Sequence, residues 1–205
     1  MKSKIPLVNE YPPLLLHLPP PLTMTDDQFF EFCQLNRDLR IERTAAGDLL
    51  VAHPVGGVTS WRNGKVTAAL ENWAKRDGLG IVFDSSGGFD LPNGATRSPD
   101  AAWVKRSRLA KLTTEEKEKF IPLCPDFVIE LRSPSDRLRD VQDKMAEYVA
   151  NGLQLGWLID PQQRQVFVYT HPDRVEHLEN PTQLSGEPLL PGFVLNLEAI
   201  WTVDF

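Results

Sequence analysis

The sequence has no apolar run long enough to cross a membrane. Its longest run near the start, Leu14 to Leu16, lies between prolines, whereas a membrane-spanning helix needs about 20 consecutive apolar residues. The same prolines interrupt the apolar centre that a secretory signal requires. We therefore expect a cytoplasmic protein that does not associate with membranes.

Cysteine and histidine are too few and too scattered to form a recognisable site. Cys33 and Cys124 each lie alone in an apolar segment, and the four histidines show no metal-ligand spacing. This pattern excludes a zinc-finger motif and a disulfide framework. It predicts two reduced thiols in the core of the protein.

Positive charge is also scarce. The net charge of −6 argues against broad, non-specific attraction to nucleic acid. The segment 97–144 differs, because it holds eleven Lys/Arg against nine Asp/Glu, a balance of +2 that leaves −8 for the rest of the chain. A locally basic segment of this kind is compatible with a small phosphate-binding face.

The chain of 205 residues has the length of one domain with a sizeable core. A proline-rich arm is expected over residues 1–23, followed by a single domain over 24–205. Capping boxes at Thr25–Gln28 and Thr113–Glu116 predict two helix starts. The periodicity predicts an α/β fold, with a mixed central sheet flanked by helices and extra β-hairpins. The expected helices are 25–36, 60–76 and 138–151, the last capped by 133–136 and ended by Gly152, and the expected strands are 39–43, 49–53, 80–84, 88–91, 100–104, 127–132, 155–159 and 166–169, with weaker ones near 175–178 and 193–195.

Two of the apolar strands each carry one carboxylate. The first strand begins at Asp100, directly after Pro99, and the second, 127–132, contains Glu130. A buried or half-buried carboxylate is costly unless it is paired or binds a metal. If the two strands are neighbours, both carboxylates can lie within reach of one divalent cation.

Side-chain alternation along strand 127–132 puts Glu130 on the same face as Val128. The main-chain carbonyl of Leu131 follows directly and is a natural additional ligand. Mg²⁺ prefers oxygen ligands, often one or two carboxylates completed by water and substrate phosphate. Asp100, Glu130 and Leu131 are therefore the candidate metal ligands.

Simpler interpretations of the two carboxylates remain open. Asp100 can cap the turn after Pro99, which is a common role for aspartate. Glu130 can form a structural ion pair with Arg132 or with Arg97. Spacing alone does not decide between these roles and a metal site.

A lysine on the following helix is a further candidate. Within helix 138–151, Lys144 lies on the flank of the apolar stripe, beside Tyr148 one turn later. From there its ammonium can orient an attacking water or neutralise charge on a phosphate. Spacing alone favours a surface pair with Asp140 at i, i+4 instead. Glu147 is expected to point away from the site.

The order and content of several segments resemble one known family. This is the bacterial family of Uma-type "putative restriction endonucleases", which is placed in the PD-(D/E)XK nuclease superfamily. The resemblance runs from about residue 25 to 201 and implies a restriction-endonuclease-like αβββαβ core. The segments that carry it are GFDLPNGATRSPDAAWV, PDFVIELRSPSDRLRDVQDKMAEYVANG, LGWLID and LLPGFVLNLEAIW.

The resemblance also implies roles for individual residues. Asp100 corresponds to the first metal-binding acid and Glu130 to the second. The lysine of the superfamily's acid-x-lysine triplet falls at position 132, where this chain has arginine, a poor proton donor or acceptor near neutral pH. The resemblance places that lysine on the following helix, which makes Lys144 the candidate. Arg132 is then expected to bind an adjacent phosphate bidentately.

The implied activity is hydrolysis of DNA phosphodiester bonds by an endonuclease that depends on Mg²⁺ or Mn²⁺. Many nucleases that cut both strands act as two-fold dimers, so a homodimer is an expected assembly. Glu42 and Asn63 lie in segments that also resemble the family, and either can add a polar contact. The alternative is a catalytically silent member that binds nucleic acid or a protein partner, which the acidic net charge and Arg132 favour. A third option is a metal-dependent hydrolase of another phosphate ester.

Overall fold

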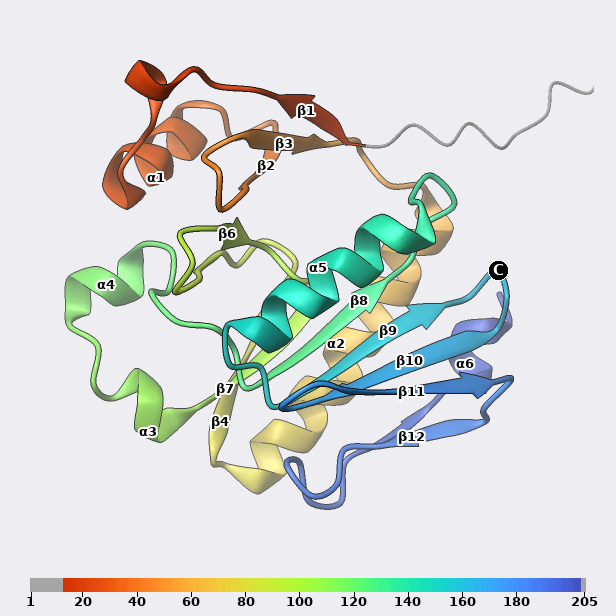
Figure 1. Ribbon diagram of the computed structural model, residues 1–205. Coiled ribbons are helices and arrows are strands. Elements are labelled where there is room, and N and C mark those ends of the chain that lie inside the picture. The colour runs from red at the N-terminus through yellow and green to blue at the C-terminus, as the bar shows by residue number, and fades with distance from the viewer. Residues whose placement is uncertain (1–12, 204–205) are drawn as a thin grey trace, which may run out of the picture.

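A six-stranded mixed sheet forms the centre of the computed structural model, which describes residues 13–203 (Figure 1). Strands β8 and β9 run parallel, and the other neighbouring pairs are antiparallel. Ala101 at the start of β7 lies opposite Ile129 of β8, so the two strands associated with the carboxylates are neighbours, as expected. The strand order is β11 (Arg174–Glu179), β10 (Gln165–Thr170), β9 (Leu155–Asp160), β8 (Phe127–Leu131), β7 (Ala101–Lys105) and β4 (Gly80–Asp84).

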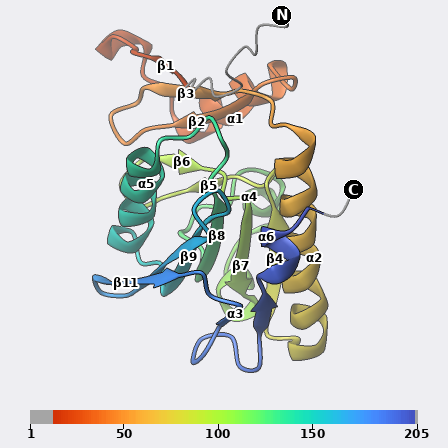
Figure 2. The same cartoon turned by 90° about the vertical axis from the view of Figure 1, so that its right-hand side faces the viewer.

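Two long helices cover the two faces of this sheet. Helix α2 (Gly57–Asp77) lies on one face and α5 (Leu138–Ala150) on the other (Figure 2). Phe127, Ile129 and Leu131 of β8 pack in the cluster on the α2 side, whereas Val128 packs with residues of α5. The predicted alternation is confirmed, and it directs Glu130 toward α5.

A second sheet lies beside α5, at the end of the central sheet where β7 begins and β8 ends (Figure 1). Helix α1 (Asp26–Leu35) lies in the chain between β1 and β2, two strands of this second sheet. The part of the predicted arm that contains Leu14–Leu16 pairs with β3 as an edge strand, while residues 1–12 lie outside the described part. The strand order is β1 (Leu14–Leu16), β3 (Leu49–Ala52), β2 (Arg40–Arg43), β6 (Thr96–Arg97) and β5 (Phe89–Asp90).

Two expected strands that are neighbours in the sequence belong to different sheets. A turn separates the segments 80–84 and 88–91, and in it Asp84 accepts a hydrogen bond from the Ser86 main-chain amide. Beyond the turn the chain leaves the central sheet, because β4 pairs with β7 while β5 pairs with β6. Alternation shows that a segment is extended, but it does not identify the strand with which it pairs.

Helix boundaries follow local signals at most positions. Both predicted capping boxes are present, at α1 and at α4 (Thr114–Glu118). The expected cap of α5 is wrong: its N-cap is Arg137 without a side-chain cap, and Asp136 instead accepts the Ser133 amide at 2.8 Å. The remaining elements are α3 (Arg106–Leu109), the 3₁₀ turn Pro20–Leu22, β12 (Gln183–Ser185), β13 (Val194–Asn196) and α6 (Glu198–Trp201).

The structure also bears on the expectations for thiols and membranes. Cys124 is buried, Cys33 is half-buried, and both are free thiols. Burial raises the pKa of Cys33 to about 11 and that of Cys124 to about 12, so both remain protonated. Across residues 13–203, no helix is both long and apolar enough to cross a bilayer.

Candidate active site

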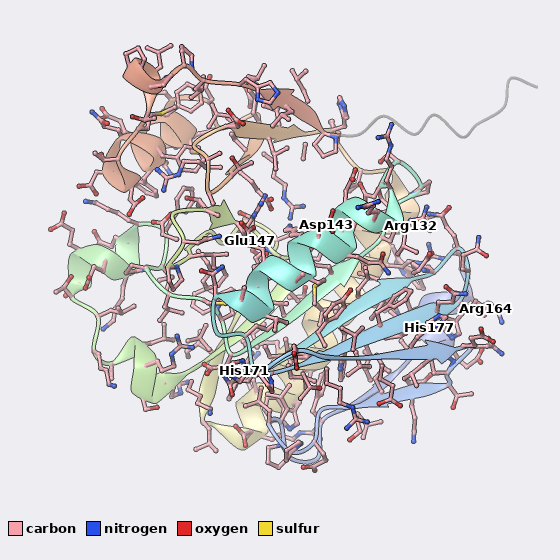
Figure 3. The ribbon with its side chains drawn as sticks, viewed as in Figure 1. Arg132, Asp143, Glu147, Arg164, His171 and His177 are labelled. Atoms are coloured by element: carbon pink, nitrogen blue, oxygen red, sulfur yellow. The ribbon has the colours of Figure 1, made fainter. Side chains whose placement is uncertain are left out.

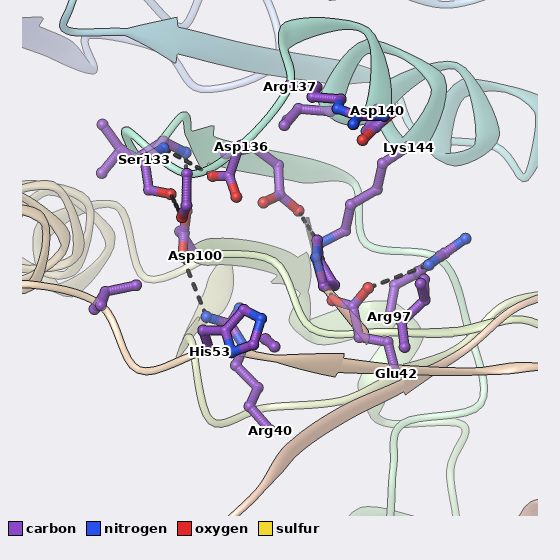
Figure 4. A pocket seen from close by; sticks show the side chains of 18 of the residues that line it. Arg40, Glu42, His53, Arg97, Asp100, Ser133, Asp136, Arg137, Asp140 and Lys144 are labelled. Carbon is purple, nitrogen blue, oxygen red and sulfur yellow. Dashed lines mark hydrogen bonds and ion pairs between the residues drawn. The ribbon is translucent and has the colours of Figure 1, made fainter. Parts of the chain in front are cut away.

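A cavity of about 700 Å³ lies between the second sheet and α5 (Figure 4). Strands β1, β2 and β3 line one side, and α5 with the loop before it lines the other. Asp100, Glu130 and Leu131 line the cavity where β7 begins and β8 ends, and Lys144 also lines it. The structure therefore brings the predicted metal ligands and the predicted catalytic lysine into one cleft.

Asp100 is held rigidly at the start of β7. Its Oδ2 accepts the Leu131 amide at 2.8 Å, and its Oδ1 accepts the Asn63 side-chain amide at 3.0 Å. Arg40 of β2 lies 3.6 Å from the same Oδ1. These contacts fix Asp100 against β8 and go beyond a local cap of the turn after Pro99.

Glu130 is buried and faces Lys144. Its Oε1 lies 2.8 Å from the Lys144 Nζ and accepts the Tyr148 hydroxyl at 3.2 Å. The pKa of Glu130 is raised to about 7, chiefly by burial and also by the nearby charges of Asp100 and Glu42, against the opposing effect of Lys144. A carboxylate with a raised pKa among other acids is a common feature of functional sites.

Lys144 connects two carboxylates. Besides Glu130, its Nζ lies 2.8 Å from Oε1 of Glu42 on β2. Burial opposes the charged form of Lys144, but Glu130 and Glu42 outweigh this effect and raise its pKa. In the described structure Lys144 forms these two ion pairs rather than the surface pair with Asp140 that spacing favoured.

Glu42 is the centre of a buried charge network. It accepts the Ser98 amide at 2.9 Å and the Arg97 guanidinium at 3.2 Å, and Arg97 in turn donates to Glu147 at 2.6 Å. Burial alone would raise the pKa of Glu42, but Lys144 and Arg97 outweigh it and lower the pKa to about 2. The expectation for Glu147 is wrong, because it faces the second sheet and lines the cavity (Figure 3).

Arg132 lies apart from these residues. Its guanidinium donates to Asp160 at 2.8 Å and to the Asp136 carbonyl at 3.0 Å, near the start of α5 (Figure 3). Asp160 is fully buried. Arg132 is not among the described residues that line the cavity, so its contacts are those of a structural ion pair.

The donor set fits a hard divalent cation. Two carboxylates and one main-chain carbonyl are oxygen ligands of the kind Mg²⁺ takes, with the remaining positions left to water and substrate. The side-chain oxygen of Asn63, beside Asp100, is buried without a hydrogen-bond partner, which a cation or its bound water would satisfy. Over residues 13–203 no group of three or more His, Cys, Asp or Glu could hold a metal, so the Leu131 carbonyl and substrate oxygens would have to complete the set.

Sequence reasoning underestimated the contribution of the second sheet. Arg40 and Arg97 of this sheet line the cavity, and Glu42 contacts Lys144 directly. Asn63, which contacts Asp100, comes from α2. The resemblance pointed to Glu42 and Asn63 without giving them a role. Nothing in the local pattern marked Arg40, because its position depends on how the second sheet packs against the first.

The chain is similar to known proteins in sequence and in fold. The model of the Uma2 family, described as "Putative restriction endonuclease", matches residues 26–198. A solved structure described as a "putative nuclease belonging to DUF820" from Anabaena variabilis ATCC 29413 has a similar fold, with a TM-score of 0.69 and 20% identity, over 87% of this chain and 97% of that one. No curated protein matches the chain. Because the family model spans most of the chain, the resemblance predicted from sequence is confirmed, and the chain belongs to the Uma2 family.

Proposed function

We propose that this protein is a divalent-metal-dependent endonuclease that hydrolyses phosphodiester bonds of DNA. The observation that carries the proposal is the convergence of Asp100, Glu130 and Lys144 in one cleft, with the Lys144 Nζ 2.8 Å from Glu130. Membership of the Uma2 family supports the reaction class. Mg²⁺ is the proposed cofactor, and Mn²⁺ is expected to replace it.

Asp100, Glu130 and the Leu131 carbonyl would hold the metal. When bound, a divalent cation at such a site activates water and stabilises the departing oxygen. Lys144 keeps its proton because its pKa is raised by the flanking carboxylates. It is therefore suited to donating hydrogen bonds to the attacking water or to a phosphate oxygen, and unsuited to acting as a base.

Phosphate binding is better assigned to Arg40 and Arg137 than to Arg132. Both Arg40 and Arg137 line the cavity. Arg40 lies 3.6 Å from Asp100, at the candidate metal ligand itself, and Arg137 is exposed near the start of α5. Arg132 is engaged by the buried Asp160. The phosphate contact expected for Arg132 therefore gains no support from its surroundings.

The test is a plasmid-nicking assay in Mg²⁺ and in Mn²⁺, with chelator as the blank. We expect nicking by the wild-type protein and a loss of about a hundredfold or more in Asp100→Ala, Glu130→Gln and Lys144→Ala, because each substitution removes a metal ligand or a charge that stabilises the transition state. Nicking that survives in Asp100→Ala would overturn the site assignment.

A catalytically silent binding protein is the second candidate. It is favoured by the ion pairs that already compensate the carboxylates, with Arg40 at Asp100 and Lys144 at Glu130. Titration calorimetry with Mn²⁺ separates the two functions. Saturable binding that disappears in Asp100→Asn supports the nuclease, and absence of metal binding to the wild type supports the silent protein.

A further inference from the structure

One wall of the cleft is apolar although the residues opposite it are charged. Leu15 of β1 lies opposite Leu50 of β3 in the register, and both line the cavity. Leu15 is 42% exposed and Val55 is 45% exposed. Exposed apolar side chains beside a candidate active site indicate a ligand with apolar surface of its own. The apolar residues of this wall are Pro13, Leu15, Leu50, Ala52 and Val55.

The charges of the cleft are poorly suited to a double helix. The described residues that line it include seven carboxylates and four Lys/Arg side chains. Three of the four basic side chains, Arg40, Arg97 and Lys144, already contact carboxylates of the site. Duplex DNA carries one negative charge per about 1.7 Å of its axis, and binding it depends on many free basic side chains. An unpaired strand carries a lower linear charge density.

The candidate catalytic carboxylates are deeply placed. Asp100 is 7% exposed and Glu130 is 6% exposed. A scissile phosphate must enter the cleft to reach them. A narrow, flexible strand can do so, whereas a phosphate within an intact duplex is flanked by the bulk of both strands.

From these three observations we propose that the cleft accepts an unpaired DNA strand, whose base faces pack on the wall formed by Leu15, Leu50 and Val55. In a duplex the base faces are stacked inside, so the wall could contact only sugars, phosphates and base edges. In an unpaired strand the faces are available to apolar side chains. This proposal rests on the endonuclease function and specifies its substrate class.

The first experiment measures binding separately from cleavage. A short fluorescein-labelled oligonucleotide is titrated by anisotropy with the full chain in Ca²⁺, alone and annealed to its complement. We expect the single strand to bind at least tenfold more tightly. Equal or tighter binding of the duplex overturns this inference, even if the duplex is cut and the endonuclease function stands. Selective binding of a single strand that is never cut in Mg²⁺ or Mn²⁺ supports the inference and overturns the endonuclease. Binding of neither form overturns both.

Two leucines of β1 supply a matched pair of variants. Leu15 lines the cavity, whereas Leu14 is 54% exposed and is not among the described lining residues. We expect Leu15→Ser to weaken single-strand binding by about threefold to tenfold, the effect of losing one partly buried apolar contact. Leu14→Ser should bind like the wild type. Equal effects of the two substitutions would overturn the role of the wall.

Discussion

The side chain of Lys144 lies 2.8 Å from that of Glu42, a residue 102 positions earlier in the chain. Glu42 belongs to β2 of the second sheet and Lys144 to α5, which covers the central sheet. The second sheet therefore contributes to the charged site and does more than cover it. Glu42 and Glu130 both contact the same ammonium, which keeps it charged and limits its movement.

Glu42→Gln tests this positioning role. The amide can still accept a hydrogen bond, but it no longer fixes the ammonium by charge. We expect kcat for nicking to fall by about tenfold to a hundredfold, the usual effect of removing a supporting partner of a catalytic centre, with little change in KM. The matched control is Glu71→Gln, since Glu71 pairs with Lys75 on the exposed surface of α2. A rise in KM with kcat unchanged would contradict the positioning role.

The pKa of Glu42 also predicts how the free energy of unfolding changes as the pH falls. Its folded pKa of about 2 lies below the ordinary value of 4.5. A depressed carboxylate pKa contributes stability that is present above the unfolded pKa and is lost as pH falls from about 4.5 toward 2. A shift of this size corresponds to about 3 kcal/mol.

Urea unfolding at a series of pH values measures this contribution. We expect the wild type to lose more stability than Glu42→Gln on going from pH 5 to lower pH, because the variant has no proton to take up at this position. The two curves should converge in acid. Parallel curves would show that Glu42 is not held ionised by Lys144 and Arg97.

The roles that follow from local periodicity could be predicted from the sequence. Alternation in β8 placed Glu130 opposite the face that packs on α2, and the helical stripe placed Lys144 on its flank. The structure brings both into the cleft. Spacing favoured Asp140 as the partner of Lys144, because the two residues lie one turn apart on the same helix. This prediction is wrong, because the tertiary packing brings Glu42 and Glu130 to within 2.8 Å of the ammonium.

The contribution of the second sheet could not be predicted in the same way. The expected strand 88–91 contains β5, but β6 is only two residues long, which is too short for alternation to identify. Arg40 and Glu42 reach the site through the pairing of β2 with β3 and β6 and through packing between sheets. Such long-range contacts depend on the assembled tertiary structure and leave no periodic signal in the chain.

Metal binding should stabilise the folded protein. A ligand that binds the folded state alone adds about 2.7 kcal/mol at a hundredfold excess over its Kd, and for a chain of this size this raises Tm by about 5–10 °C. We expect Mn²⁺ to raise the Tm of the wild type and to leave Asp100→Asn unchanged. Asp173→Asn, in the exposed turn between β10 and β11, is the control and should respond like the wild type. An equal response in Asp100→Asn would place the metal elsewhere.

Arg132 is expected to affect stability far more than chemistry. Its guanidinium pairs with the fully buried Asp160 at 2.8 Å. The other carboxylate oxygen of Asp160 accepts a hydrogen bond from the main-chain amide of Gln162 at 3.0 Å. Arg132→Ala leaves a buried carboxylate without its cation, which costs about 3–5 kcal/mol. Arg139→Ala is the control, because Arg139 forms an exposed i, i+4 pair with Asp143 whose loss costs about 0.5 kcal/mol or less.

Chemical denaturation and nicking kinetics together test the role of Arg132. The midpoint of urea unfolding should fall strongly in Arg132→Ala and hardly at all in Arg139→Ala. Because Arg132 lies outside the cavity lining, the folded fraction of Arg132→Ala at low temperature should keep a kcat within about threefold of the wild type, a difference of under 1 kcal/mol in activation free energy. A large fall in kcat with unchanged stability would instead restore Arg132 as a phosphate ligand and would remove the reason for assigning that contact to Arg40 and Arg137.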